Sequence, residues 1–187
     1  MDIPKVIDVM LADLALVASS QPNERLPKEE QIRCSLYAAI RPLYRVVCAE
    51  RGYASIDDGS RIECDLWASS PQTPPVWIEF KRCWAAKDWV NKPSEQLRDW
   101  EADIQKLRQL SLEGDRYFIL MGLFDCDPLC EQESASNGVA NNIGRFYRCQ
   151  LVHSDSRPFT WRTDDGLTCI GAWVWHWPSG VAVGAAA

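Results

Sequence analysis

Apolar residues recur at helical spacing in three parts of the chain. Residues 2–20 place them three and four positions apart, which predicts an amphipathic helix that packs on the rest of the domain. A second apolar stripe predicts a helix over residues 28–50, bent or split by Pro42 and ended by Gly52. A third stripe predicts a helix over residues 93–112, opened by a proline and a serine N-cap.

The remaining apolar runs are typical of strands. Residues 53–56 and 61–68 flank a turn rich in Asp and Gly, which predicts a β-hairpin. A continuous apolar run at residues 117–124 predicts a strand buried on both faces. Further strands are predicted at residues 76–84, 145–153 and 168–177. This order of helices and strands predicts an α/β fold, with a mixed β-sheet flanked by helices.

Length and composition indicate one soluble domain. The chain has 187 residues, of which 47% are hydrophobic and 25% charged, so we expect a single domain over residues 1–187. Polar loops are predicted at residues 69–75 and 125–142, and the tail, residues 178–187, is predicted to be mobile. The first segment lacks the basic start of a signal peptide, and no stretch is long enough to span a membrane.

Eight cysteines sit singly inside apolar stretches, which predicts reduced, buried thiols and a cytoplasmic protein. Cys126 and Cys130 come closest to the spacing of metal ligands, but no second pair or suitably placed His completes a zinc site. The net charge of −6 argues against a surface that coats nucleic acid. Binding to DNA or RNA would therefore need a local basic patch or a second subunit.

Three charged residues stand inside the apolar strands. Asp65 lies midway along one strand, and Glu79 and Lys81 lie two positions apart on the next. Because side chains alternate along a strand, Glu79 and Lys81 share a face, while Val76, Ile78 and Phe80 form the opposite, apolar face. If the strands pair, Asp65 lies about 5 Å away across the ladder.

Such charges raise the free energy of the fold unless they are paired or bind a cation, so these positions indicate a site. The alternative is structural. Glu79 and Lys81 would then be a solvated pair on an open face of the sheet, with Asp65 opposite Lys81 in a cross-strand ion pair.

Asp65, a spacer of thirteen residues and Glu79-Phe80-Lys81 together resemble the D-x(n)-(D/E)-x-K motif of the PD-(D/E)XK nuclease superfamily. The resemblance covers roughly residues 28–124, where a helix with an acidic residue precedes the hairpin and a long helix and a buried strand follow Lys81. Cys64 stands where the motif's name has proline. The resemblance implies a restriction-endonuclease-like core.

The resemblance also implies roles at the site. Asp65, Glu79 and the Phe80 carbonyl would be ligands of Mg²⁺ or Mn²⁺, and Lys81 would orient or deprotonate the attacking water. The preceding helix would supply a further acidic ligand. Glu29 lies about 40° from the centre of the apolar stripe and Glu30 about 140°, at 100° per residue, so Glu29 is the better candidate. A shift of one residue in the helix start would reverse that choice.

Residues 81–108 contain seven Lys or Arg against five acids, with tryptophans interleaved. Cations with aromatic rings suit single strands and flipped bases. The candidate nucleic-acid contacts are Arg82, Trp84, Lys87, Trp89 and Lys92. The alternative is a mixed-charge helix face with buried tryptophans. Gln96 and Lys106 on the helix after Lys81 are weaker candidates. Either they reach the site, as the resemblance implies for some relatives, or they are surface residues, which is the favoured interpretation.

These patterns lead to two main hypotheses about the function of the protein. The first is a metal-dependent nuclease that acts on DNA in preference to RNA. The second is a catalytically silent binding protein on the same fold, such as an inhibitor, an immunity factor or a subunit of a complex, with a protein partner or a second copy of itself. A purely structural α/β domain is the third. With two His, no phosphate-binding loop and no nucleophile elbow, ATP-driven and esterase chemistry are not indicated.

Overall fold

The computed structural model describes residues 1–20, 27–55, 58–83, 93–108, 110, 113–125, 149–160 and 167–177. Its elements are α1 (Ile3–Ser20), α2 (Glu29–Ile40), β1 (Val46–Ala54), β2 (Arg61–Ser70), β3 (Thr73–Cys83), α4 (Pro93–Arg108), β4 (Asp115–Asp125), β5 (Gln150–Thr160) and β6 (Leu167–Trp177). The predicted mixed α/β architecture is confirmed.

The strands form one six-stranded sheet in the order β1-β2-β3-β4-β6-β5. β3 and β4 are parallel, whereas the other neighbouring strands are antiparallel. Parallel neighbours need a crossover connection, and α4 lies in the connection between β3 and β4. α4 is therefore held directly against the strand that carries Glu79 and Lys81.

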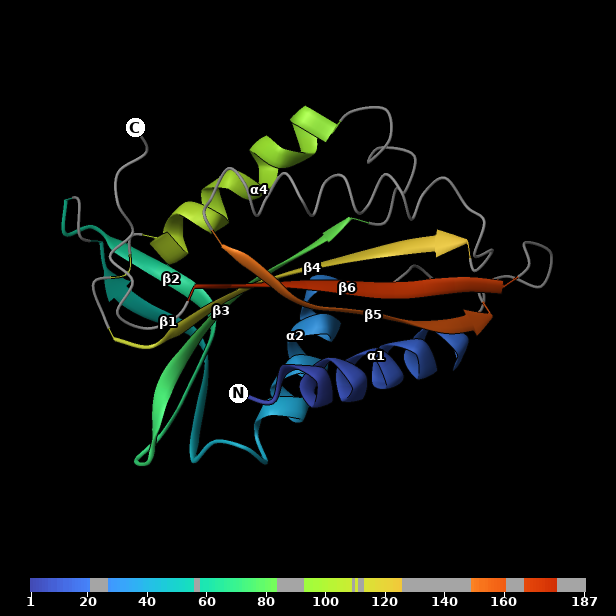
Figure 1. Cartoon of the computed structure of the whole chain (residues 1–187), viewed down its shortest axis with the longest axis horizontal. Helices are drawn as coiled ribbons and strands as arrows, with labels where there is room; N and C mark the ends of the chain where they lie inside the picture. The colour runs from blue at the N-terminus through green and yellow to red at the C-terminus, as the bar shows by residue number, and fades with distance from the viewer. Residues whose placement is uncertain are drawn as a thin grey trace.

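The helices cover opposite faces of the sheet, α1 and α2 on one and α4 on the other (Figure 1). Each face has its own apolar cluster. Leu14, Leu36 and Ile119 belong to the cluster under α1 and α2, whereas Trp100 and Trp175 belong to the cluster under α4. The tryptophans of β6, Trp173, Trp175 and Trp177, are buried in the second cluster, as packing predicts.

The helix predicted over residues 28–50 is wrong in its second half. α2 ends at Ile40, and residues 46–54 form the edge strand β1. Pro42 has no backbone N–H and cannot continue a helix, and the β-branched Val46 and Val47 favour an extended chain. The apolar spacing continued past the proline, but β1 pairs with β2 as the first arm of a longer hairpin.

Other boundaries also differ. The polar loop predicted at residues 69–75 is a two-residue turn at residues 71–72, with strand on either side. The strand predicted at residues 145–153 is β5, which begins at Gln150 and extends to Thr160. The predicted loop at residues 125–142 and tail at 178–187 lie outside the described residues, apart from Asp125, the last residue of β4.

The cysteines are not all thiols. Cys34, Cys48, Cys64 and Cys149 are free, whereas Cys169 is disulfide-bonded to a cysteine whose side chain is not described. The expectation of reduced, buried cysteines is therefore wrong for Cys169, which is oxidised, and for Cys34, which is exposed, while Cys48 and Cys149 are only partly buried. The cytoplasmic location that it supported stays a prediction. Within the described ranges, no helix has the length and apolar character needed to cross a membrane.

Candidate functional site

The site lies where β2 and β3 separate. The two strands pair from Ser70 opposite Thr73 to Leu66 opposite Ile78, so Asp65 and Glu79 occupy the first position beyond the paired register. Side chains replace the ladder there, because the Phe80 N–H donates to Asp65 Oδ2 at 3.0 Å. The Cys64 thiol donates to the Ile78 carbonyl, also at 3.0 Å. Asp65 is therefore fixed against the backbone of the Glu79-Phe80-Lys81 segment.

A local distortion of the hairpin accompanies this separation. Glu50 of β1 has a φ of 53°, in the left-handed region that non-glycine residues rarely adopt, and it stands opposite Asp65 where the β1–β2 register is interrupted. Leu66 and Ala68 are buried in the cluster under α1 and α2, whereas Cys64 is buried in the cluster under α4. Side chains two apart normally share a face, so the alternation changes phase at Asp65.

On β3 the predicted alternation is confirmed. Val76, Ile78 and Phe80 are buried in the cluster under α1 and α2, and Trp77 is buried in the cluster under α4. Glu79 and Lys81 share the face of Trp77, since both contact side chains of α4.

Glu79 is fully buried, at 0% exposure. Within the described residues neither of its carboxyl oxygens has a hydrogen-bond partner, and the ammonium of Lys106 lies 3.9 Å from Oε2. Burial, followed by the charge of Asp65, raises the pKa of Glu79 well above its usual range. Among the described acidic groups of the site, this carboxyl is therefore the least satisfied, and its surroundings favour the neutral form.

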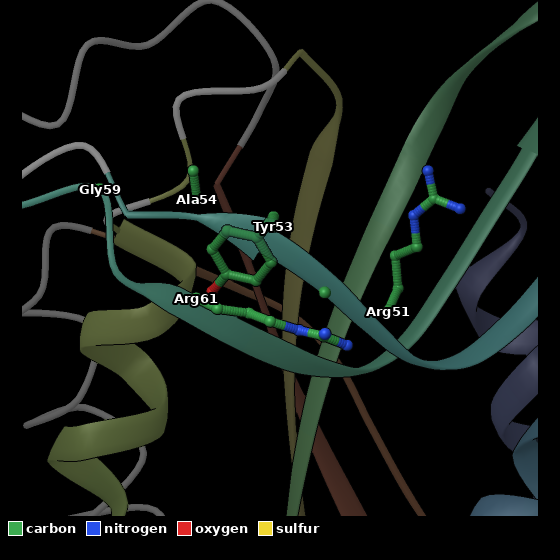
Figure 2. A pocket seen from close by; sticks show the side chains of 6 residues that line it. Arg51, Tyr53, Ala54, Gly59 and Arg61 are labelled. Carbon is green, nitrogen blue, oxygen red and sulfur yellow. The ribbon is translucent and has the colours of Figure 1, made fainter.

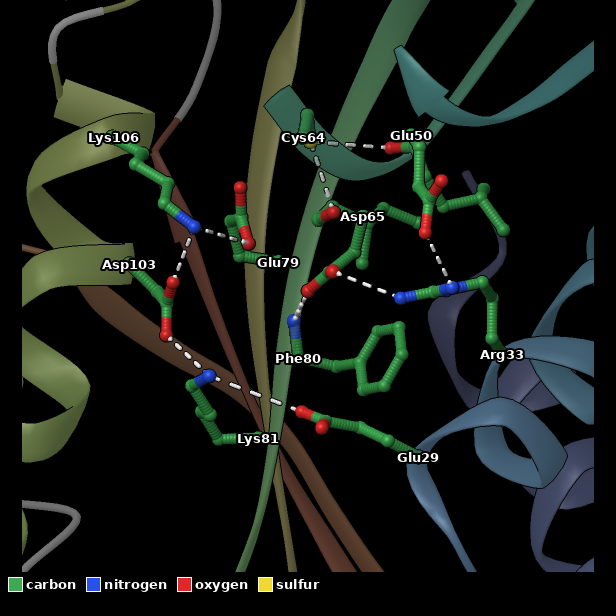
Figure 3. Close-up of polar contacts among 12 residues, drawn as sticks. Glu29, Arg33, Glu50, Cys64, Asp65, Glu79, Phe80, Lys81, Asp103 and Lys106 are labelled. Carbon is green, nitrogen blue, oxygen red and sulfur yellow. Dashed lines mark hydrogen bonds and ion pairs between the residues drawn. The ribbon is translucent and has the colours of Figure 1, made fainter. Parts of the chain in front are cut away.

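Lys81 is paired on two sides. Its Nζ lies 3.0 Å from Asp103 Oδ2 and 3.8 Å from Glu29 Oε1 (Figure 3). Burial by itself lowers the pKa of Lys81, but the hydrogen bond and charge of Asp103, together with the charges of Glu29 and Asp65, raise it overall. Lys81 is therefore a protonated ammonium at neutral pH.

Asp103 was not predicted from the sequence. Only 6% of its side chain is exposed, and its second oxygen, Oδ1, accepts from Lys106 Nζ at 2.6 Å. It lies in the apolar stripe of α4, between Trp100 and Ile104, which are both buried. An acid inside an apolar helical stripe was the available signal. Lys106, named above as a residue that would reach the site or lie on the surface, is one-third exposed and contacts both Asp103 and Glu79.

Arg33 is a second residue that sequence reasoning missed. It lies one helical turn after Glu29 on α2, and its guanidinium is 2.8 Å from Glu50 and 3.6 Å from Asp65. Glu29 lies in ion-pair range of Lys81, whereas Glu30 is exposed, so the choice of Glu29 as the residue facing the site agrees with the geometry. The contact partner of Glu29 is Lys81 rather than Asp65.

The acidic and basic groups are not balanced. Among the described residues, five carboxyl groups (Glu29, Glu50, Asp65, Glu79 and Asp103) face three cations (Arg33, Lys81 and Lys106). With every carboxyl ionised, the group would carry two net negative charges. No group of three His, Cys, Asp or Glu side chains in the described part of the chain is arranged to hold a metal ion.

A smaller donor set is chemically sufficient for one class of ion. Mg²⁺ is usually bound through one or two carboxylates and keeps several waters. Glu79, whose two oxygens have no hydrogen-bond partner among the described residues, and Asp65, held beside Phe80, supply two carboxyl groups of this kind.

Of the five predicted nucleic-acid contacts, the structure describes only Arg82. Arg82 is exposed on β3, with its guanidinium 3.5 Å from the Pro27 carbonyl. Trp84, Lys87, Trp89 and Lys92 lie outside the described residues, and so does the side chain of Gln96.

An open pocket of about 440 Å³ lies elsewhere, on the hairpin of β1 and β2 (Figure 2). Its lining residues are Arg51, Gly52, Tyr53, Ala54, Gly59 and Arg61. Tyr53, which lines it, donates to the Lys106 carbonyl at 2.9 Å, but no described residue that lines the pocket forms an ion pair with Glu79 or Lys81.

Comparisons with protein-family models, with curated proteins and with solved structures found no match to this chain.

Proposed function

We propose that the protein is a divalent-metal-dependent nuclease that hydrolyses phosphodiester bonds, of DNA in preference to RNA. The observation that carries the proposal is the buried Glu79 carboxyl, whose oxygens have no hydrogen-bond partner within the described residues. A buried charge without partners is costly, and such groups are commonly paired or bind a metal. The element order α2, β1–β3, α4 and β4 also supports the resemblance to the PD-(D/E)XK superfamily.

In this proposal Asp65, Glu79 and the Phe80 carbonyl hold Mg²⁺ or Mn²⁺, and Glu29 is the ligand from the helix. When bound, the metal would polarise the scissile phosphate and lower the pKa of a bound water. The Phe80 N–H fixes one Asp65 oxygen, which leaves the other directed toward Arg33. Asp65 is thus oriented by the backbone before any ligand arrives.

Lys81 would act on the phosphate as a cation. Its raised pKa keeps the ammonium protonated, which favours stabilising negative charge over accepting a proton from water. Asp103 and Glu29 hold the ammonium on the face that Lys81 shares with Glu79. Arg82, which is exposed next to it, would contact a neighbouring phosphate, with Trp84, Lys87, Trp89 and Lys92 as further contacts.

Cleavage assays test the proposal directly. The purified chain is incubated with single- and double-stranded DNA and RNA in Mg²⁺, in Mn²⁺ or in a chelator. We expect metal-dependent cleavage that falls at least about 100-fold in Lys81→Ala, because a positioned transition-state cation is lost. Lys5→Ala, which removes an exposed lysine of α1, is the matched control and should cleave as the wild type does. Equal cleavage by the wild type and Lys81→Ala would identify a contaminant and sink the proposal.

The second candidate is a binding protein without catalysis. It is favoured by the ion pairs that already occupy Lys81 and Arg33 and by the net charge of −6. A basic protein partner would pair with the partly exposed carboxylates Glu29 and Glu50, at 42% and 61% side-chain exposure, since Glu79 itself is fully buried. Stable co-purification with such a partner, in a complex that Glu50→Gln weakens and that shows no cleavage with any metal, would select this candidate.

A further inference from the structure

Asp103 binds two ammonium groups at once. Its Oδ2 lies 3.0 Å from Lys81 Nζ and its Oδ1 lies 2.6 Å from Lys106 Nζ. The carboxylate is almost completely buried, at 6% side-chain exposure, so water screens these contacts weakly. Figure 3 shows Asp103 on α4 between the two lysines, with Glu79 across from Lys106.

The two carboxyl groups near Lys106 lie at different distances from its ammonium. The ammonium is 2.6 Å from Asp103 but 3.9 Å from Glu79, which is too far for a hydrogen bond. Glu79 is the more deeply buried of the two, and an ammonium at that distance is strongly attracted to a buried carboxyl group once that group is ionised. Lys106 is hydrogen-bonded to Asp103 and not to Glu79, whose oxygens remain without a hydrogen-bond donor among the described residues.

We propose that Asp103 is a positioning residue that holds Lys106 away from Glu79 and so reserves the Glu79 carboxylate for a divalent cation. The inference rests on the proposed metal-dependent function. Lys106 and the cation compete for the same Glu79 oxygens. Asp103 favours binding of the cation, because it gives the ammonium a closer hydrogen-bond acceptor.

The substitution Asp103→Asn tests the competition. The amide keeps the size of the side chain but removes its charge, so Glu79 becomes the nearest carboxylate to Lys106. We expect Mn²⁺ to bind about tenfold more weakly, within the range seen when a residue that orients metal ligands is lost. The readout is the dissociation constant of Mn²⁺ for the full chain, from the electron paramagnetic resonance signal of the free ion.

The double variant Asp103→Asn/Lys106→Met tests whether Lys106 causes the weaker Mn²⁺ binding. It lacks the competing ammonium, so Mn²⁺ affinity should return to within about threefold of the wild-type value. A merely structural role of Asp103 would give no such recovery. Glu101→Gln removes an exposed carboxylate from the same helix and should leave the affinity unchanged.

The outcomes separate the two proposals. Wild-type protein that binds no Mn²⁺ overturns the metal-dependent function and this inference with it. Wild-type protein that binds Mn²⁺, with Asp103→Asn equally tight or with no recovery in the double variant, overturns the role of Asp103 alone. If Asp103→Asn does not fold, Lys106→Met decides. Tighter Mn²⁺ binding supports the competition, and unchanged or weaker binding overturns it.

Discussion

The two halves of the β2–β3 pair are built differently. From Ser70 to Leu66 the strands form a ladder in which the backbone groups pair with each other. Beyond Leu66 the ladder stops. There the Asp65 carboxylate accepts a hydrogen bond from the Phe80 N–H, and the Cys64 thiol donates one to the Ile78 carbonyl. The first half is stabilised by backbone pairing that most sequences can make, whereas the second depends on particular side chains and can place charged groups inside the sheet.

The largest effect on stability is expected next to the paired half, which contains a register shift between Ala68 and Ser70. Gly114 precedes β4 with a φ of +130°, and a Cβ added there would lie 2.4 Å from the Pro75 carbonyl oxygen at the start of β3. Gly114→Ala should therefore lower the free energy of unfolding by about 2–4 kcal/mol, through backbone strain and this clash. Urea denaturation measures the loss.

Gly59→Ala is the matched control. Gly59 also has a positive φ, of +72°, but an added Cβ there would have no atom within 4 Å. Its loss should stay near 1–2 kcal/mol, the usual strain of a left-handed residue. Equal losses in the two variants would show that the close approach of Pro75 does not matter.

An intermediate effect, of opposite sign, is expected at the separated half. Burial, and then the charge of Asp65, raise the pKa of Glu79 above the ordinary value of 4.5. A carboxyl whose pKa is higher in the folded than in the unfolded chain destabilises the fold once it ionises, so stability is lost as pH rises above 4.5 toward the folded pKa. In a chelator, Glu79→Gln should be more stable than the wild type at pH 8 by about 1–3 kcal/mol.

The difference should shrink as the pH is lowered toward 4.5, where the wild-type carboxyl is increasingly protonated. Thermal unfolding of both proteins across this pH range gives the measurement. Glu63→Gln, an exposed acid on β2 with 53% side-chain exposure, should show no such pH-dependent gain. A Glu79→Gln variant that is less stable than the wild type at pH 8 would contradict the account of Glu79 as an unsatisfied charge.

The smallest effect concerns the thiol that replaces a ladder bond. Cys64 is fully buried and donates to the Ile78 carbonyl. Cys64→Ala should cost about 1 kcal/mol in urea denaturation, the net value of one hydrogen bond with a small packing loss. Cys48→Ala on β1, where the thiol is only half-buried, should cost less. Similar values for the two would mean that the Cys64 hydrogen bond adds no stability.

The sequence predicted the parts of the site that local rules control. Alternation along a strand placed Glu79 and Lys81 on one face, and spacing along α2 selected Glu29 over Glu30. Both rules depend only on a residue and its near neighbours. They held because β3 and the first turn of α2 are regular.

Partners set by tertiary contacts were not predicted. The phase change at Asp65 depends on Glu50, fifteen residues earlier on a segment whose apolar spacing predicts helix. Asp103 reaches Lys81, and Lys106 reaches Glu79, only because α4 docks on β3 and β4. Periodicity shows which face of a helix is apolar, but not which strand it covers, so Asp103 did not stand out as a member of the site.

Because α4 covers Glu79, hydration of the Glu79 carboxyl depends on whether this helix is docked on the sheet. When α4 lifts from the sheet, water reaches the Glu79 carboxyl, and the solvation that it regains offsets part of the cost of exposing Trp100 and Ile104. The segment above the acid is thereby favoured for partial opening of the native molecule. A cation bound to Glu79 would oppose this opening and stabilise the docked position of α4.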